Sequence, residues 1–213
     1  MSSPAGPVPT PLRYVALGDS YTIGTSVEPG VRWPDQLAAA LAGPPPALEL
    51  VANLGVDGYT SRDLIRDELP ALTTLAPGFA SVLIGVNDVV HGVPADTYAA
   101  NVNQILDAVL AQLAPDRVVT VAIPDYTVTP AGADYGDPRP RRDGIVANNA
   151  IMARASVERG IRFVDTFDLS RHAAKDRSLV AADGLHPSGR QYALWVGRIA
   201  PVVVELLAPS VGR

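Results

Sequence analysis

The chain has 213 residues, of which 47% are hydrophobic and 18% charged, so it is long and apolar enough for one well-buried core and is neither disordered nor fibrous. Its net charge of −5 argues against sequence-independent binding of nucleic acid, which needs a basic face. The absence of cysteine excludes disulfides, thiolate metal sites and cysteine catalysis, and no run approaches the roughly 20 apolar residues of a membrane span.

The sequence predicts one central domain with a short segment at each end. Residues 1–11 are rich in proline and small side chains and lack the basic start and apolar centre of a secretion signal, so we expect a flexible tail. On this basis we expect a cytoplasmic protein, with an export signal removed beforehand as the alternative. Residues 12–208 contain no repeat and no linker and are predicted to form a single catalytic domain, followed by a tail at residues 209–213.

Apolar runs alternate with helical patterns throughout this domain. The runs predict five strands, at Tyr14–Leu17, Leu48–Ala52, Ser81–Ile84, Val118–Ile123 and Ile161–Asp165. Helical spacing and capping signals predict helices that begin near Pro34 and Thr60, a long helix across 102–113, and another at 144–158. They also predict a C-terminal helix with Pro187 in its first turn that contains Trp195. Strands separated by helices favour a parallel sheet with helices on both faces, which is a three-layer α/β/α fold.

The segment Thr127–Asp143 interrupts this alternation. Its prolines, glycines and charged residues predict a loop after the fourth strand. Because this loop leaves the sheet at the edge where ligands bind, it is either a lid over the site or a solvated connection. Its arginines, Arg139, Arg141 and Arg142, either meet an anionic substrate or face solvent.

Ser20 is the candidate nucleophile. It follows the first predicted strand, directly after Gly18 and Asp19, and therefore lies at the carboxyl end of that strand. Ligands bind at this edge in open α/β sheets. A serine hydroxyl is a weak nucleophile unless a base and donors that stabilise an anion converge on it. The chain must therefore also supply a histidine, a carboxylate and oxyanion donors.

His186 is the candidate base among the three histidines. Asp183 stands three residues before it in a tight loop, so a turn can bring the carboxylate to the Nδ1–H and leave Nε2 facing the serine. A helix-capping aspartate beside an idle histidine is the structural alternative. His172 lies among charged residues and is typical of a surface helix. His91 lies just beyond the third strand, near the pocket, but nothing nearby is spaced to orient it as a base.

Two residues are candidate donors to an oxyanion. Gly55 follows the second strand and lets a backbone N–H approach a ligand, and Asn87 follows the third strand and brings a side-chain amide to the same edge. Either residue is also common in ordinary turns. The strand order 2-1-3-4-5 makes Ser20 and Asn87 neighbours at the switch point of the sheet. The convergence of these groups with His186 on one edge predicts acyl transfer.

With these residues identified, the chain resembles the SGNH hydrolases, also called the GDSL esterase/lipase family. The resemblance rests on four blocks in order between residues 13 and about 207: Gly18-Asp19-Ser20-Tyr21, Asn53-Leu54-Gly55, Gly85-Val86-Asn87-Asp88 and Asp183-Gly184-Leu185-His186-Pro187. It implies a flavodoxin-like sheet, hydrolysis of esters or thioesters without a metal or organic cofactor, and an oxyanion hole formed by the N–H groups of Ser20 and Gly55 and the Asn87 amide. Thr22 replaces the second glycine of a Gly-x-Ser-x-Gly elbow, which argues against the ordinary α/β-hydrolase fold.

The predicted function is hydrolysis of small or medium acyl esters through an acyl-enzyme on Ser20, with a small-molecule ester as the expected partner. The alternatives are a carbohydrate O-deacetylase of the same family, a non-catalytic binding module, and a protein that binds nucleotides or transfers phosphate. The last is disfavoured because no Gly-x-x-x-x-Gly-Lys loop is present and Asp19 is negative where phosphate would lie. Further candidates for the pocket are Asp19, Tyr21, Asp88, His91 and Tyr126; the tyrosines, with Tyr59, either stack on a sugar or pack against the sheet.

Overall fold

The computed structural model describes residues 10–43 and 47–208. The expected C-terminal tail at 209–213 and all but the last two residues of the expected N-terminal tail lie outside the described residues. Five parallel strands form one sheet in the order β2-β1-β3-β4-β5, as predicted. The strands are β1 (Leu12–Gly18), β2 (Leu48–Asn53), β3 (Phe79–Leu83), β4 (Val118–Val121) and β5 (Arg162–Val164).

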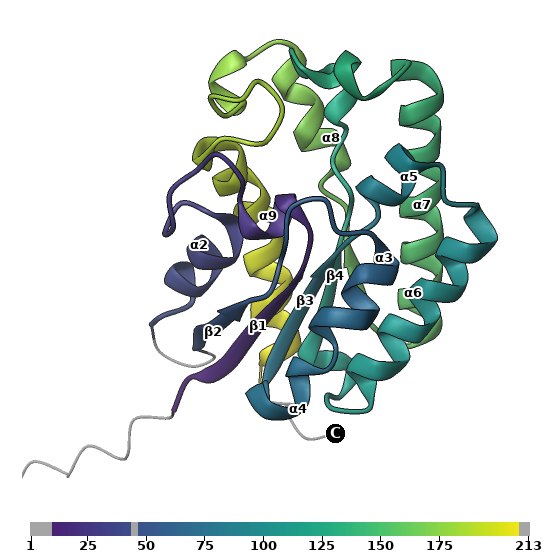
Figure 1. The fold of residues 1–213 in the computed structure, drawn as a ribbon. Helices are drawn as coiled ribbons and strands as arrows, with labels where there is room; N and C mark the ends of the chain where they lie inside the picture. The colour runs from purple at the N-terminus through teal and green to yellow at the C-terminus, as the bar shows by residue number, and fades with distance from the viewer. Residues whose placement is uncertain (1–9, 44–46, 209–213) are drawn as a thin grey trace, which may run out of the picture.

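Helices cover both faces of this sheet (Figure 1). The α-helices are α1 (Ser20–Ile23), α2 (Trp33–Ala40), α3 (Ser61–Asp63), α4 (Ala71–Leu75), α5 (Val86–His91), α6 (Ala95–Leu110), α7 (Pro138–Glu158), α8 (Phe167–Ser170) and α9 (Gly189–Leu207). A π-helical segment, η1 (Leu64–Glu68), continues α3, and five 3₁₀ turns complete the described elements: η2 (Pro115–Arg117), η3 (Tyr126–Val128), η4 (Gly132–Tyr135), η5 (Arg171–Ala174) and η6 (Arg177–Leu179).

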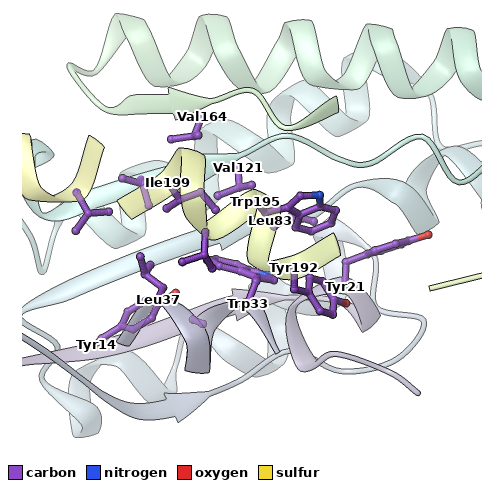
Figure 2. Close-up of a cluster of buried hydrophobic side chains, with 14 of the residues drawn as sticks. Tyr14, Tyr21, Trp33, Leu37, Leu83, Val121, Val164, Tyr192, Trp195 and Ile199 are labelled. Atoms are coloured by element: carbon purple, nitrogen blue, oxygen red, sulfur yellow. The ribbon is translucent and has the colours of Figure 1, made fainter. Parts of the chain in front are cut away.

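The core has two halves, one on each face of the sheet. Along β1, Tyr14 and Ala16 point into one half, whereas Val15 and Leu17 point into the other, because successive side chains of a strand face opposite ways. Helices α2 and α9 cover the first half, and Figure 2 shows their aromatic side chains Trp33, Tyr192 and Trp195 packed together over the sheet. Helix α6, the η1 segment and part of α7 cover the second half.

The predicted loop at Thr127–Asp143 is shorter than expected. Helix α7 begins at Pro138, so the prediction of a loop is wrong for residues 138–143. The carboxylate of Asp137 caps the helix by accepting the Arg139 N–H at 3.1 Å, and Pro138 and Pro140 fit the first turn, where a backbone N–H needs no partner. The same prolines that indicated a loop therefore begin a helix.

Two other helix starts test the sequence patterns. The predicted capping box is present at the start of α3, where Thr60 and Asp63 exchange hydrogen bonds, although the chain then widens into the π-helical η1 segment. The last helix starts later than predicted. Pro187 precedes the helix, and Ser188 caps α9 by accepting the Gln191 N–H at 3.3 Å.

Candidate active site

The end of β1 turns sharply to present Ser20. Gly18 adopts a φ of +154°, and a Cβ there would lie 2.2 Å from the Leu83 carbonyl oxygen, so only glycine fits. Asp19 then caps α1, with its Oδ1 accepting the Tyr21 N–H at 3.0 Å. Ser20 is the first residue of α1 and is 7% exposed, at the carboxyl end of the strand as predicted.

A tight turn before α9 presents the histidine. The Gly184 N–H donates to the Ala181 carbonyl at 3.0 Å, and Gly184 itself has a φ of +75°. The carboxylate of Asp183 folds back inside this turn. Its Oδ1 accepts the N–H of Leu185 at 2.9 Å and the N–H of His186 at 3.0 Å. The turn therefore fixes the carboxylate by backbone hydrogen bonds before the imidazole contributes.

A continuous hydrogen-bonded chain links Asp183, His186 and Ser20. Asp183 Oδ2 lies 2.6 Å from His186 Nδ1, and His186 Nε2 lies 2.9 Å from Ser20 Oγ. Ser20 and His186 are 166 positions apart in the chain, yet the structure brings them together as the sequence predicted. The ring of Tyr21 packs against the imidazole, with centroids 5.2 Å apart, and limits how far the ring can turn.

Hydrogen bonding keeps Asp183 ionised. Burial opposes the charge, but the N–H of Leu185, the His186 imidazole, the Ser26 hydroxyl and the N–H of His186 together outweigh it and lower the pKa of Asp183 to about 2. A carboxylate that stays negative can hold the imidazole in the tautomer with a proton on Nδ1. Nε2 is then free to accept the proton of Ser20.

A cavity of about 240 Å³ opens beside Ser20 and His186. Its lining combines apolar and aromatic side chains with polar groups that include Ser20 and Asn87. The lining residues are Ser20, Tyr21, Asp57, Gly58, Val86, Asn87, Val90, Tyr126, Tyr135, Leu185 and His186. Tyr126 and Tyr135, which both line the cavity, meet edge to face with ring centroids 6.0 Å apart.

Asn87 lies in the first turn of α5, directly after β3, and lines this cavity with Ser20. Its Nδ2 donates to the Tyr59 carbonyl at 2.9 Å, which fixes the direction of the amide. Because an amide nitrogen carries two protons, one remains for a further acceptor. Ser20 and Asn87 thus line the same cavity, as the predicted strand order implies.

Gly55 does not have the environment predicted for an oxyanion donor. Its N–H donates to the side chain of Asn53 at 3.2 Å, and Gly55 does not line the cavity at Ser20. A Cβ on Gly55 would lie 2.7 Å from the Ile23 nitrogen and 2.8 Å from the Asp19 carbonyl oxygen. This glycine is therefore needed for close packing against α1 and not for the approach of a ligand.

Gly58, which the sequence analysis missed, is the glycine of this loop at the cavity. It lines the cavity, has a φ of +78°, and a Cβ there would meet nothing within 4 Å. Its N–H donates to no group in the described part of the chain, in contrast to that of Gly55. The Asp57-Gly58 pair is a standard turn signal and would have pointed to this position.

The remaining pocket candidates divide into three groups. Tyr21 and Tyr126 line the cavity. Asp19 and Asp88 are fully buried beneath the site and do not reach the cavity. His91 is wrongly placed by the prediction, because it ends α5 on the surface and does not line the cavity. The sequence patterns do not predict four further lining residues, Val86, Val90, Tyr135 and Leu185.

Two buried carboxyl groups lie beneath Ser20 without a cation to pair with in the described chain. Burial raises the pKa of Asp19 to about 8, despite the hydrogen bond from the Tyr21 N–H. Burial also raises the pKa of Glu68 to about 9, although Glu68 Oε2 accepts the Gly18 N–H at 2.9 Å. One oxygen of each group has no hydrogen-bond partner. Burial therefore favours the protonated form of both groups near neutral pH.

Within residues 10–43 and 47–208, no three histidine, aspartate or glutamate side chains gather in an arrangement that could hold a metal ion. Among these same residues, no helix is both long and apolar enough to cross a membrane.

The comparisons with known proteins find one matching family model and several similar folds. A family model described as the GDSL-like lipase/acylhydrolase family matches residues 16–194. The chain is similar in structure to TesA, with a TM-score of 0.71 and 20% identity over 92% of this chain and 99% of TesA. No curated protein sequence matches the chain.

Two further solved structures have the same fold at low sequence identity. A lipolytic protein of the G-D-S-L family from Veillonella parvula matches with a TM-score of 0.70 and 18% identity, over 89% of this chain and 97% of that one. A catalytic mutant of Axe2, an acetylxylan esterase from Geobacillus stearothermophilus, matches with a TM-score of 0.70 and 19% identity, over 95% of this chain and 96% of that one. Catalytic mutants of Axe2 carry changes at a serine, an aspartate and a histidine.

Proposed function

This chain belongs to the GDSL-like lipase/acylhydrolase family, and from that premise we propose that it is a serine esterase that hydrolyses small or medium acyl esters through an acyl-enzyme on Ser20. The observation that carries this proposal is the hydrogen-bonded chain from Asp183 through His186 to Ser20, with distances of 2.6 Å and 2.9 Å. Each heavy-atom distance is within the range that proton transfer requires.

The proposed reaction has two halves. In the first, His186 Nε2 takes the proton of Ser20 as its oxygen attacks the acyl carbonyl, and the imidazolium then returns the proton to the leaving alcohol. In the second, a water molecule gives its proton to the same nitrogen as its oxygen attacks the acyl carbonyl. The bond to Ser20 Oγ then breaks, the imidazolium returns the proton to Ser20, and the acid leaves. Asp183 stays ionised throughout and stabilises the imidazolium that forms in each half.

The negative oxygen of the tetrahedral intermediate needs donors. We propose the second amide proton of Asn87 together with the backbone N–H groups of Ser20 and Gly58. Support for Gly58 in place of Gly55 comes from its position on the cavity wall and from its N–H, which has no partner in the described chain. The raised pKa values of Asp19 and Glu68 also favour this step, because a protonated carboxyl at either position adds no negative charge near the oxyanion.

The size of the cavity favours short acyl groups. Its volume of about 240 Å³ is below the roughly 300–1,000 Å³ that is usual for drug-sized ligands. Val86, Val90 and Leu185 form an apolar wall that suits an acyl chain.

A sugar ester is the second candidate substrate. Tyr21, Tyr126 and Tyr135 line the cavity, and aromatic rings of this kind can stack on a sugar. The likeness to the acetylxylan esterase Axe2 points to the same class. In that case the reaction is the same, and the sugar hydroxyl is the leaving group.

Hydrolysis of a panel of p-nitrophenyl esters from two to sixteen carbons tests the proposal, run beside an acetylated xylo-oligosaccharide and an acyl thioester. We expect the highest kcat/KM at the short end of the panel. Ser20→Ala should lower kcat by roughly 10⁴–10⁶-fold, because no other side chain replaces the nucleophile.

His172→Ala is the matched control for His186→Ala. His172 is exposed on η5 and lies outside the cavity, so its loss should leave the rates unchanged. Hydrolysis that survives Ser20→Ala would contradict the acyl-enzyme, and binding of esters without turnover would favour the non-catalytic module.

A further inference from the structure

Ser26 makes a hydrogen bond that the proposed mechanism does not use. Its hydroxyl donates to Asp183 Oδ2 at 2.7 Å, and this is the oxygen that lies 2.6 Å from His186 Nδ1. Ser26 lies three residues beyond the end of α1, and 157 positions separate it from Asp183 in the chain. The loop after the nucleophile is therefore tied to the carboxylate that orients the base.

The backbone of Ser26 is strained. Its φ is +66°, and within the described residues Ser26 and Ala76 are the two non-glycine residues with positive φ. Ser26 is the third residue of a turn closed by the Val27 N–H, which donates to the Gly24 carbonyl at 3.3 Å. Glycine is strongly preferred where a turn requires positive φ at that position. A serine in this conformation is less stable than a glycine would be.

The positive φ has a local structural reason at Ala76 but not at Ser26. Ala76 ends α4, where a left-handed residue closes the helix, and its N–H donates to the Leu72 carbonyl at 2.9 Å. Ser26 ends no helix, because Gly24 already closes α1. Strain that the local fold does not require is a pointer to function, and the contact that uses the Ser26 side chain is the one with Asp183.

We propose that Ser26 is a positioning residue of the active site, a fourth member of the hydrogen-bonded chain that holds Asp183 Oδ2 toward His186. This inference rests on the proposed esterase function. With the Ser26 hydroxyl in place, Oδ2 has two donors and the carboxylate has four in all, so its plane is fixed from both sides. Loss of the hydroxyl leaves Oδ2 with the imidazole alone.

Removal of this donor has two physical consequences. The carboxylate becomes free to rotate about its Oδ1 bonds, which lowers the fraction of enzyme with the imidazole aligned on Ser20. The negative charge on Oδ2 is also shared with one donor fewer, so the imidazolium is held more tightly. The titratable and charged groups around Ser26 are Asp183 and His186 at the site, and Arg32 and Asp57, which line a second cavity together with Ser26. A substitution at Ser26 removes none of these groups.

Three variants separate positioning from a structural role. Ser26→Gly removes the hydroxyl and relieves the strain, Ser26→Ala removes the hydroxyl and keeps the strain, and Ala76→Gly relieves a similar strain away from the site. The measurements are the melting temperature and the pH profile of kcat and kcat/KM for p-nitrophenyl acetate, after wild type and Ser20→Ala have established that hydrolysis depends on Ser20.

We expect both Ser26 variants to lower kcat by about 3- to 10-fold, the factor that one hydrogen bond typically provides, and Ser26→Gly to melt about 1–4 °C above Ser26→Ala because it relieves the strain. Both Ser26 variants should move the acidic limb of the kcat/KM profile to higher pH, with KM little changed. Ala76→Gly should gain stability with an unchanged profile.

Unchanged kcat and an unchanged profile in Ser26→Gly would overturn the inference. An activity that follows the melting temperature, with Ser26→Ala much less active than Ser26→Gly, would also overturn it, because that result indicates a structural role. In either case Ser20-dependent hydrolysis by the wild type would leave the proposed esterase function standing.

Discussion

Carboxyl groups on two sides of Ser20 have opposite environments. Asp183 has a side chain that is 28% exposed and accepts four hydrogen bonds, and its pKa falls to about 2. Asp19 is fully buried with one oxygen unpartnered, and its pKa rises to about 8. The number of donors and the access of water, not the residue type, therefore decide which aspartate is ionised beside the nucleophile.

The largest loss of activity should come from removing the negative charge of Asp183. Asp183→Asn should lower kcat for p-nitrophenyl acetate by about 10⁴-fold, because an amide favours the wrong imidazole tautomer. Asp19→Asn replaces a neutral acid with a neutral amide and should stay within roughly tenfold of wild type, since no charge is lost. Equal losses in the two variants would contradict the comparison.

Removal of the Asn87 amide, the proposed side-chain donor to the oxyanion, should give the next largest loss of activity. Asn87→Ala should lower kcat by about 10²–10³-fold with a smaller change in KM, because the amide acts on charge that develops only in the transition state. Thermal melting of the same variant measures the structural part, namely the lost bond to the Tyr59 carbonyl. A rise in KM at unchanged kcat would show that Asn87 only binds substrate.

The buried carboxyl group of Glu68 should have a smaller effect, which appears in the pH dependence of the free energy of unfolding. Glu68 in the folded protein keeps its proton to about pH 9, whereas the unfolded chain releases it near 4.5. The folded state binds more protons between these values, so its stability falls as pH rises through this window. Glu68→Gln removes that loss and should exceed the wild type by roughly 1–3 kcal/mol at pH 9 and by little at pH 5.

Urea unfolding at both pH values checks this prediction. Glu158→Gln is the control, because Glu158 is exposed at the end of α7. If Glu68→Gln were less stable than wild type at pH 9, Glu68 would be ionised and paired with a group that the structure does not place beside it.

The sequence predicted the sheet because its strands are continuous apolar runs that the helices separate. It also predicted the Asp183–His186 pair, since three residues of turn bring the two side chains together whatever surrounds them. The boundaries of α7 and α9 were less accurate. A proline interrupts the preceding structure whether it lies in a loop, as Pro187 does, or in the first turn of a helix, as Pro138 does. Only the capping side chains of Asp137 and Ser188 locate the start of each helix.

The features that the sequence did not predict depend on contacts between distant segments. Gly55 and Gly58 belong to the same loop, and which one reaches the cavity depends on the packing of Gly55 against α1. A glutamate such as Glu68 is typical of a protein surface, and it is the π-helical segment that places its carboxyl group against the Gly18 N–H. Ser26 has no periodicity or motif, and its role follows from one contact across the fold.

Covalent labelling of Ser20 tests the central claim most directly. The protein is incubated with diethyl p-nitrophenyl phosphate, a phosphate ester that traps activated serines, and the adduct is located by mass spectrometry of peptides. We predict a single adduct on Ser20 that is absent in Ser20→Ala and forms far more slowly in His186→Ala. No adduct, or an adduct on another residue that persists in Ser20→Ala, would contradict the account.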